Sequence, residues 1–585
     1  MPAARSCLAL LILVSLCSCS RNRPASVPEL VQEFVTATLE FWPVTATASG
    51  YHNKNGLSLD EQIDNYDEVE LRKQREFYRD FQKKLEAVDA AALEPPDLAD
   101  LEILRTQCEY QLLELDTIQT YKHNPTLYVE LAGKAIFDPF VLLYAPADER
   151  YAHISARLLK IPQLYGQARQ NLIDSPELWT TVAIRENDGN RDFIVKVLLE
   201  QAPEEWKRRL ERPSQEALAA IDSFTAWMNT TLRQKKSDWR LGHDRYAAKF
   251  KVVMGLGQTP EQVLADAESE LRRVRDEMGA IAASMGPAAA KPSPAGVDGI
   301  VVPALHRIAL QHSTRDQYFP QAERDLAGIT AFVRGQGFMP MPARGNLKVI
   351  ETPEFMRGIY AVGGFNPAPP LQPELGAFYW LTPFEDSMEP ERVESKLREY
   401  NNYGLKILTI HEAMPGHYLQ FEFANDVKPP YRRVLRSVFA NGPNVEGWAV
   451  YATDLMVAHG YMADDPAFKL TWLKQYLRAV ANTILDVRLH TMGMTDEDAM
   501  TLMTGQTFQE KEEATAKLQR AKLSSVQLPT YFAGYRAWKR LREHAEKQSG
   551  FDEKAFHETA LAAGAVSMAS LEKIIAAGAS STAAR

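Results

Sequence analysis

The chain has 585 residues, 45% of them hydrophobic, and carries a formal net charge of −10 at pH 7. A chain of this length can bury a sizeable core and can contain more than one subdomain. The acidic balance, without any long run of Lys and Arg, excludes nucleic acid as an expected partner and indicates an acidic soluble protein.

The first residues have the pattern of an export signal. Arg5 precedes an apolar stretch over residues 8–16, which is too short to span a bilayer. The tetrad Leu16-Cys17-Ser18-Cys19 resembles the bacterial lipobox, in which a Cys after a small residue is lipidated. We therefore predict a lipoprotein signal peptide at residues 1–18 and lipidation of Cys19. The alternative is an ordinary cleaved signal.

A lipidated Cys19 implies an exported protein anchored in the cell envelope, in the periplasm or at the outer membrane, that contacts the membrane through this lipid only. Apart from Cys7, Cys17 and Cys19 at the N-terminus, the chain has only Cys108, so no intramolecular disulfide is possible in the globular part. The hydrophobic core must then supply the stability of the exported protein.

Residues 19–285 are predicted to form a helical N-terminal region, because apolar residues recur at helical spacing in runs rich in Leu, Ala, Glu, Gln and Arg. Thr259, Pro260 and Gln262 predict a capping box at the start of a helix, and Pro213 is predicted to mark a helix boundary. The predicted helices include residues 71–93, 98–117, 154–172, 216–232 and 264–285.

Residues 286–299 lack periodicity and carry three Pro, so they predict an exposed loop or linker before a second region, 300–585. In that region a helix over 321–334 is followed by three short segments whose β-branched and aromatic residues predict strands. The segments are 347–351, 358–363 and 376–382. This small sheet either offers an edge strand to an extended peptide or only walls the core.

The central motif of the second region is a pair of His around a Glu. His411 and His417, with Glu412 as a general base, are the residue types that a catalytic zinc site needs. The two His are six residues apart, which separates them by about 120° on a regular helix. Pro415 and Gly416 predict a kink or helix end that brings His417 back toward His411. The alternative is a capped helix end with surface histidines.

A third metal ligand is needed from elsewhere in the chain. Asn444 is predicted as the N-cap of a helix over 445–459, with Glu446 in its first turn. A Glu in that position commonly just complements the helix dipole. Glu446 is nevertheless a candidate ligand, because only one helix and a loop separate it from His411.

Two motifs together support a resemblance to a known family. His411-Glu412-Ala-Met-Pro-Gly-His417 and Glu446-Gly-Trp-Ala-Val-Tyr resemble the bacterial family of unknown function DUF885, whose members are similar to gluzincin metallopeptidases. The resemblance implies a mainly α, multi-helical gluzincin-like architecture with a small β-sheet next to the metal-binding helix. It also implies one Zn²⁺ per chain, held by His411, His417 and Glu446, with Glu412 as the base.

The sequence departs from the family pattern at two positions. Many relatives have a second His where Tyr418 stands, so His417 has to be the ligand here. Relatives also tend to have an acid where Thr453 stands, and a carboxylate there would hydrogen-bond a ligand His. Its absence leaves Asp454 or Glu422 as candidates for that role.

Three further residues are candidates for contacts with the substrate. His490 and Tyr531 are candidate catalytic donors to the oxyanion, because helical gluzincins commonly supply a His and a Tyr from downstream of the ligands. Arg520 is a candidate for binding a substrate carboxylate bidentately. Each has a structural alternative, a hydrogen-bonded position in the core.

The sequence therefore predicts an exported, lipid-anchored zinc hydrolase that cleaves peptide bonds in the cell envelope. One alternative is a metal-dependent amidase or esterase that acts on non-peptide or cell-wall amides with the same residues. Another is a non-catalytic binding or structural lipoprotein with a degenerate zincin fold. The presence of all four residues of the His-Glu and Glu446 motifs argues against the last of these.

Overall fold

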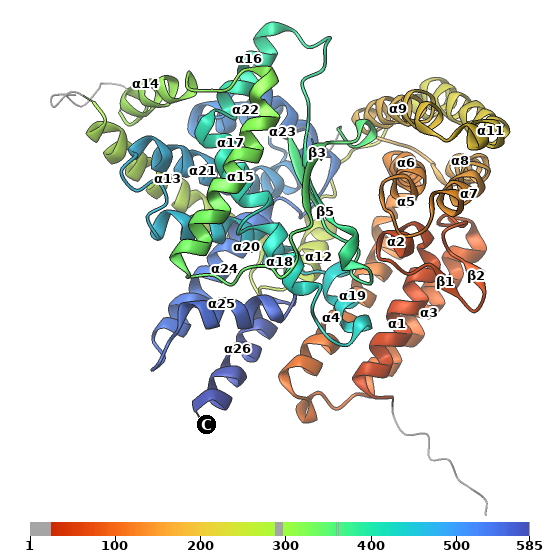
Figure 1. The fold of residues 1–585 in the computed structure, drawn as a ribbon, viewed down its shortest axis with the longest axis horizontal. Coiled ribbons are helices and arrows are strands. Elements are labelled where there is room, and N and C mark those ends of the chain that lie inside the picture. Colours follow the sequence, from red (N-terminus) through yellow and green to blue (C-terminus); the bar gives the residue numbers. More distant parts are fainter. Residues whose placement is uncertain (1–24, 287–295, 358–359, 361, 584–585) are drawn as a thin grey trace, which may run out of the picture.

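The computed structural model describes residues 25–286, 296–357, 360 and 362–583 (Figure 1). Within them the chain is mostly helical, with a three-stranded sheet and a short β-hairpin, so the predicted mainly α fold is confirmed. The predicted signal peptide, Cys19 and most of the predicted 286–299 linker lie outside the described residues. Among the described helices, none is long and apolar enough to cross a membrane.

Thirteen α-helices and a β-hairpin precede the 287–295 segment in the part of the chain that the structure describes. At Thr259 the capping box is confirmed, since the Gln262 amide donates to Thr259 Oγ1 at 3.3 Å and the Thr259 amide donates to Gln262 Oε1 at 2.9 Å. The helices are α1 (Val27–Phe41), α2 (Pro43–Ala48), α3 (Glu68–Glu86), α4 (Pro95–Leu113), α5 (Thr120–His123), α6 (Thr126–Val141), α7 (Ala147–Leu158), α8 (Ile161–Asn171), α9 (Glu177–Asp192), α10 (Leu199–Gln201), α11 (Glu204–Thr230), α12 (His243–Met254) and α13 (Pro260–Ser284). The hairpin is β1 (Asn53–Lys54) and β2 (Leu57–Ser58).

Several helix boundaries differ from the prediction. The predicted helix 71–93 ends at Glu86, as α3. The predicted helix 154–172 is divided between α7 and α8. Pro213 lies inside α11 rather than at its end. A buried stripe that includes Leu210, Pro213 and Ala217 runs through this point, and its packing outweighs the hydrogen bond that a Pro removes from a helix.

The remaining elements form the second region. The helices are α14 (Asp298–Ala309), α15 (Tyr318–Gln336), α16 (Pro390–Glu399), α17 (Asn402–Glu412), α18 (His417–Ala424), α19 (Pro430–Val438), α20 (Gly442–Ala458), α21 (Pro466–Thr491), α22 (Asp496–Met500), α23 (Lys511–Leu523), α24 (Pro529–Glu546), α25 (Glu553–Ala562) and α26 (Met568–Ala583). The strands are β3 (Leu347–Glu351), β4 (Gly363–Asn366) and β5 (Ala377–Leu381), in the order β3-β5-β4.

In this sheet β5 is central and fully buried, parallel to β3 and antiparallel to β4. The predicted strands 347–351 and 376–382 are confirmed. Of the strand predicted at 358–363, residues 358–359 and 361 lie outside the described residues, and β4 begins at its last residue, Gly363. The Tyr360 amide donates to the Met356 carbonyl at 2.8 Å. A Cβ at Gly363 would lie 2.3 Å from the Trp380 carbonyl oxygen, so only glycine lets β4 approach β5 this closely.

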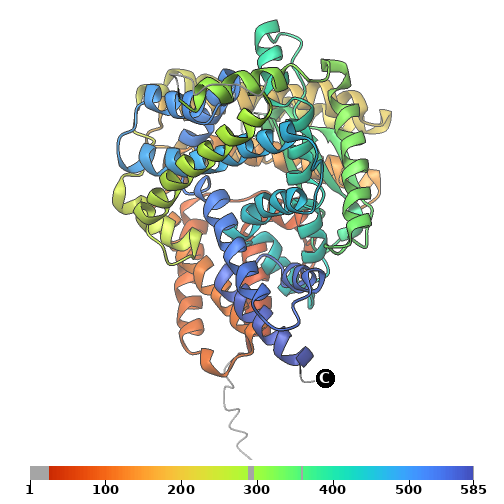
Figure 2. The ribbon, with the colours of Figure 1, turned by 90° about the vertical axis from the view of Figure 1, so that its left-hand side faces the viewer.

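The largest hydrophobic core takes residues from both sides of the 287–295 segment, from Val27 in α1 to Leu571 in α26. A second core lies among α6, α7, α8, α9 and α11 and reaches Trp380 of β5. The sheet thus lies between the N-terminal helices and the C-terminal helices (Figure 1). In Figure 2, α26 runs beside α4 at the narrow end of the molecule.

Candidate metal centre

The chain breaks between the two histidines of the motif. Helix α17 ends at Glu412 and α18 begins at His417, so the helix end predicted at Pro415 is confirmed. The Gly416 amide donates to the Ile410 carbonyl at 3.0 Å. A Cβ on Gly416 would lie 1.9 Å from the His411 carbonyl oxygen, so the break can be this tight only with glycine.

Helix α20 contacts the break between α17 and α18 and stabilises it. The indole of Trp448 donates to the carbonyl oxygens of Pro415 at 3.0 Å and Gly416 at 3.2 Å. Next to it, Gly447 of α20 meets Gly534 of α24, where an added Cβ on Gly447 would lie 2.3 Å from the Gly534 carbonyl carbon. The two glycines let α20 and α24 pack backbone to backbone, which brings side chains of both helices toward the His pair.

Helix α20 begins earlier than predicted. Its N-cap is Asn441, whose side chain accepts from the Asn444 amide at 3.1 Å, and Gly442 and Pro443 form its first positions. Asn444 is therefore not the cap. Its side chain instead donates to the Val566 carbonyl and accepts from Gln420. Glu446 accordingly lies beyond the first turn, on the side of α20 that faces the break.

The three predicted ligands converge. The candidate ligand atoms of His411, His417 and Glu446 all lie within 4.8 Å of one another. Glu446 Oε2 is 3.7 Å from His411 Nε2 and 3.5 Å from His417 Nε2, and the two imidazole rings are nearly perpendicular at a centroid distance of 4.8 Å. Glu446 Oε2 and His417 Nδ1 are buried without a hydrogen-bond partner among the described residues.

The charges of the three side chains are strongly coupled. Burial alone would raise the pKa of the Glu446 carboxyl, but the neighbouring His411 and His417 outweigh burial and hold that pKa well below its usual range. Burial likewise lowers the pKa of His417, and Glu446 overcomes this effect and raises it. The cluster therefore gathers negative charge at Glu446 and two imidazoles at one point.

Glu412 and His411 face a common cavity of about 150 Å³. Glu412 is largely buried, yet its carboxylate has no hydrogen bond or ion pair with any described residue. Strand β4 reaches the same cavity through Gly363. The predicted base thus lies beside the first predicted ligand and next to an edge strand of the sheet.

Tyr531 and Arg520 also line this cavity. The Tyr531 ring stacks on His411 at a centroid distance of 6.1 Å, and its hydroxyl accepts from Arg520 at 3.4 Å. Gln527, which the sequence did not single out, donates to Glu446 Oε1 at 3.2 Å and is within 3.3 Å of the Tyr531 hydroxyl. Gln527 lies in the loop before α24, and no motif or periodicity marks it.

The structure does not bring His490 to this cluster. Its Nε2 bonds to the Ser524 carbonyl at 2.9 Å, its Nδ1 accepts from the Leu241 amide at 3.4 Å, and its ring packs between Trp239 and Tyr246. Because both ring nitrogens are used by the backbone, His490 is the hydrogen-bonded core residue of the structural alternative. His490 is therefore not among the residues that line the cavity with His411 and Glu412.

The positions that depart from the family pattern have structural partners. The Tyr418 hydroxyl donates to the Arg344 carbonyl at 2.7 Å and so fixes the segment before β3. Thr453 donates to the Ala449 carbonyl of its own helix. Asp454 bonds Tyr535 and Lys539, and Glu422 bonds Arg344, so neither acid orients a ligand histidine.

Comparisons with known proteins agree with this architecture. The family described as bacterial protein of unknown function (DUF885) matches residues 43–575. A candidate lipoprotein of unknown function from Shewanella oneidensis is 29% identical, with a TM-score of 0.77, covering 94% of this chain and 100% of its own. A candidate lipoprotein from Colwellia psychrerythraea is 17% identical and shares the fold, with a TM-score of 0.76, covering 96% of this chain and 100% of its own. No curated protein matches the chain.

Proposed function

The chain belongs to the DUF885 family of bacterial proteins of unknown function, and from the geometry of its ligand cluster we propose that it is a zinc-dependent hydrolase that cleaves peptide bonds in the cell envelope. The observation that carries this proposal is the convergence of His411, His417 and Glu446 beside Glu412. The likeness to candidate lipoproteins supports export and a lipid anchor at Cys19.

The donor set fits zinc. Two imidazoles and one carboxylate are a common ligand set of catalytic zinc, which keeps a fourth position open. The buried Glu446 Oε2 without a hydrogen-bond donor is an atom that a cation would satisfy. When bound, zinc supplies Lewis acidity and lowers the pKa of coordinated water toward about 7. His411, His417 and Glu446 would hold it.

The other side chains have roles that follow from their places. Glu412, free of protein partners, accepts the proton of the attacking water and passes it to the leaving amine. Of the two donors predicted for the oxyanion of the tetrahedral transition state, Tyr531, which stacks on His411, is the one that lines the cavity. Gln527 donates to Glu446 Oε1, leaves Oε2 to the metal side, and thus orients the carboxylate.

A peptide is the preferred substrate because of the edge strand. Among the described residues strand β4 pairs with β5 alone, and it contributes Gly363 to the wall of the cavity that Glu412 also lines. An extended peptide can add to such an edge through main-chain hydrogen bonds. This arrangement favours a peptide over a small ester or amide, which needs no such edge.

Two measurements test the proposal. Metal analysis of the purified protein is expected to give close to one zinc per chain, and His411→Ala is expected to lose it. A mixed-peptide digest read by mass spectrometry compares the wild type with Glu412→Gln. We expect cleavage by the wild type and a loss of about 10²–10⁴-fold in the variant, with zinc retained.

The digest also separates the alternatives. The ends of the products would distinguish exopeptidase from endopeptidase action. Bound zinc without any peptide cleavage would favour the amidase or esterase, and neither zinc nor cleavage would leave a binding or structural lipoprotein. Undiminished cleavage by Glu412→Gln would remove Glu412 as the base.

A further inference from the structure

A lysine in the wall of the metal-side cavity has no partner. Lys517, on α23, is 8% exposed and lines the cavity together with His411 and Glu412. Its ammonium makes no hydrogen bond or ion pair with any residue that the structure describes. A buried charge without a partner is costly, and proteins rarely retain one where nothing binds it.

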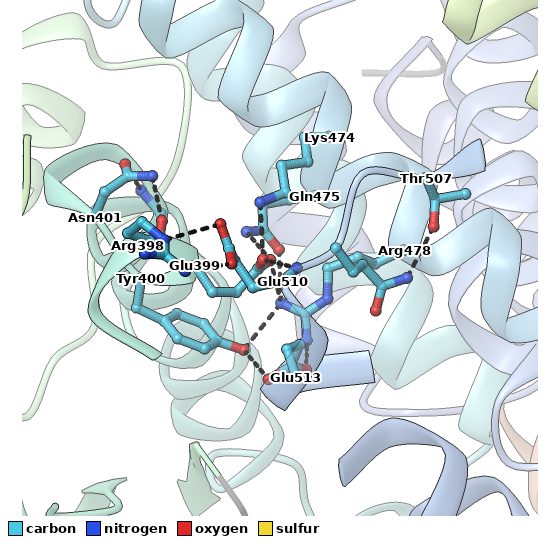
Figure 3. Close-up of polar contacts among 12 residues, drawn as sticks. Arg398, Glu399, Tyr400, Asn401, Lys474, Gln475, Arg478, Thr507, Glu510 and Glu513 are labelled. Atoms are coloured by element: carbon cyan, nitrogen blue, oxygen red, sulfur yellow. Dashed lines mark hydrogen bonds and ion pairs between the residues drawn. The ribbon is translucent and has the colours of Figure 1, made fainter. Parts of the chain in front are cut away.

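The neighbouring Arg478 also lines the cavity, but unlike Lys517 it has protein partners. Its guanidinium donates to Tyr400 at 2.9 Å and to Gln475 at 2.7 Å, and it forms an ion pair with Glu513 (Figure 3). Glu513, which lies one turn before Lys517, is therefore already used by Arg478 and accepts from Tyr400 as well. The carboxylate closest to Lys517 along the helix is not free to neutralise it.

Arg520 is the second cation of this kind. It follows Lys517 by three residues and therefore lies on the same face of α23. Its guanidinium donates to two uncharged groups, Gln527 Oε1 at 3.2 Å and the Tyr531 hydroxyl at 3.4 Å. Two adjacent basic side chains thus line the cavity, and neither forms an ion pair with a described carboxylate.

We propose that Lys517 and Arg520 form an anion subsite, which binds a carboxylate of the peptide substrate beside Glu412 and the metal ligands. The ligand is either the C-terminal carboxylate or an acidic side chain, because both present the same group. The subsite rests on the proposed peptide hydrolysis and defines its substrate class as peptides with a carboxylate near the cleaved bond. Charge-assisted hydrogen bonds from a desolvated ammonium and a guanidinium fork match this group.

The pKa of Lys517 is consistent with a binding site for an anion. Burial, reinforced by the positive charges of Arg478 and Arg520, lowers the pKa of Lys517 to about 7. A bound carboxylate would favour the charged ammonium and offset this cost. The geometry alone carries the subsite, since the lysine faces the cavity and lacks a partner.

Calorimetry with defined peptides tests the subsite. The full-length protein carries Glu412→Gln and zinc, so that peptides bind without being cleaved. The probes are N-acetyl-tetraalanine as the free acid, the same peptide as its C-terminal amide, and amides with one Glu in place of each Ala in turn. We expect the acid or one Glu amide to bind at least about tenfold more tightly than the plain amide. Which of the two binds identifies the source of the carboxylate.

Variants assign the preference to the residue. Lys517→Met is expected to abolish the preference without weakening the plain amide, and Lys517→Arg to retain most of it. Lys511→Met is the matched control, since it removes one positive charge from the exposed start of the same helix. Circular dichroism checks that each variant is folded. If Lys517→Met does not fold, the wild-type preference and the Lys517→Arg variant still decide.

Equal affinity for acid and amides, no binding of any probe, or a preference that persists in Lys517→Met would each overturn the subsite. Zinc-dependent peptide cleavage with equal affinities would leave the proposed function standing without it. A Lys517-dependent preference in a protein that cleaves no peptide would support an anion subsite and reject the peptidase.

Discussion

Two buried groups of charged residues contribute side chains to the same cavity, and they are built differently. The first, which we call the Glu399 network, joins Arg398, Glu399, Tyr400, Lys474, Arg478, Glu510 and Glu513 (Figure 3). The second is the ligand cluster of His411, His417 and Glu446. The first group lines the cavity with Tyr400, Arg478 and Glu513, and the second lines it with His411.

The Glu399 network is closed by protein groups. Glu399 is fully buried, and it accepts from Lys474 Nζ at 2.8 Å and from the Glu510 amide at 2.9 Å. Burial alone would raise its pKa, but Lys474 and Arg478 outweigh burial and lower it. In the ligand cluster, by contrast, Glu446 Oε2 and His417 Nδ1 lack hydrogen-bond partners among the described residues. A closed network is expected to stabilise the fold, and an open cluster to bind a ligand.

The largest expected effect comes from opening the closed network. Glu399→Ala would leave Lys474 buried without its partner, so we expect the free energy of unfolding to fall by about 3–5 kcal/mol. Urea unfolding of the zinc-free protein measures it. Glu216→Ala, in an exposed ion pair with Arg212, is the control and should change little. A small loss in Glu399→Ala would contradict the structural reading of the network.

The backbone contact between Gly447 of α20 and Gly534 of α24 can be broken by one added methyl group. In Gly447→Ala the new Cβ would overlap the backbone of Gly534, so α20 must move away from α24. We expect a loss of up to about 3 kcal/mol in the free energy of unfolding, and weaker zinc binding because Glu446 is the adjacent residue. Thermal unfolding and zinc titration measure the two effects.

Gly328→Ala is the matched control for this overlap. Gly328 is exposed in α15, and nothing lies within 4 Å of an added Cβ there. The variant should be neutral or slightly stabilised. Equal behaviour of the two glycine variants would show that the backbone contact of Gly447 does not hold the cluster in place.

The sequence predicted those parts of the site that depend on local chemistry. Pro415 removes a backbone donor wherever it stands in a helix, so the end of α17 could be inferred without a structure. The residue types at 411, 417 and 446 likewise pointed to a cation, and the structure brings them together. The mainly α class followed from helical periodicity over long segments.

The rest depends on contacts between distant segments. Gln527 reaches Glu446 from the loop before α24, and Lys517 faces the cavity only because of how α23 packs. His490 looked equivalent to Tyr531 in the sequence, but α21 directs it to the backbone at Ser524. Pro213 shows the same limit for the fold, since buried neighbours carry α11 through it.

Removal of zinc tests whether a metal ion binds to the ligand cluster of His411, His417 and Glu446. At free zinc about 100 times its dissociation constant, binding should add about 2.7 kcal/mol to the free energy of unfolding, and a chelator should remove this gain. Thermal unfolding with zinc and with chelator measures it. His411→Ala should show no difference between the two conditions, and a wild type equally stable in both would contradict metal binding.

A third buried site, at Glu186, extends the comparison, and its substitution is expected to have the smallest effect on stability. Glu186 of α9 is 2% exposed, neither of its carboxylate oxygens has a hydrogen-bond partner among the described residues, and it lines a cavity of about 300 Å³ together with Glu130. Unlike Glu446, it has no imidazole beside it. Burial, and after it the charge of Glu130, raises the pKa of Glu186 to about 9.

The sign of the pH dependence follows from this shift. An acid whose pKa is higher in the folded state than its unfolded value of 4.5 binds its proton more tightly when folded. Its contribution to stability is therefore complete below pH 4.5 and is lost as the pH rises toward 9. Glu186→Gln removes this loss, so we expect it to be more stable than the wild type by about 1 kcal/mol or more at pH 8 and nearly equal to it at pH 4.5.

Urea unfolding at the two pH values measures the difference, with Glu200→Gln on the exposed surface of α10 as the control. The same stability gain at both pH values would contradict the titration of Glu186. A loss of stability in Glu186→Gln at pH 8 would mean that the ionised carboxylate has a favourable partner. The Glu186 carboxylate would then resemble that of Glu446, whose Oε2 lacks a hydrogen-bond partner and is proposed to bind a cation. It would not be a buried carboxylate that only destabilises the fold.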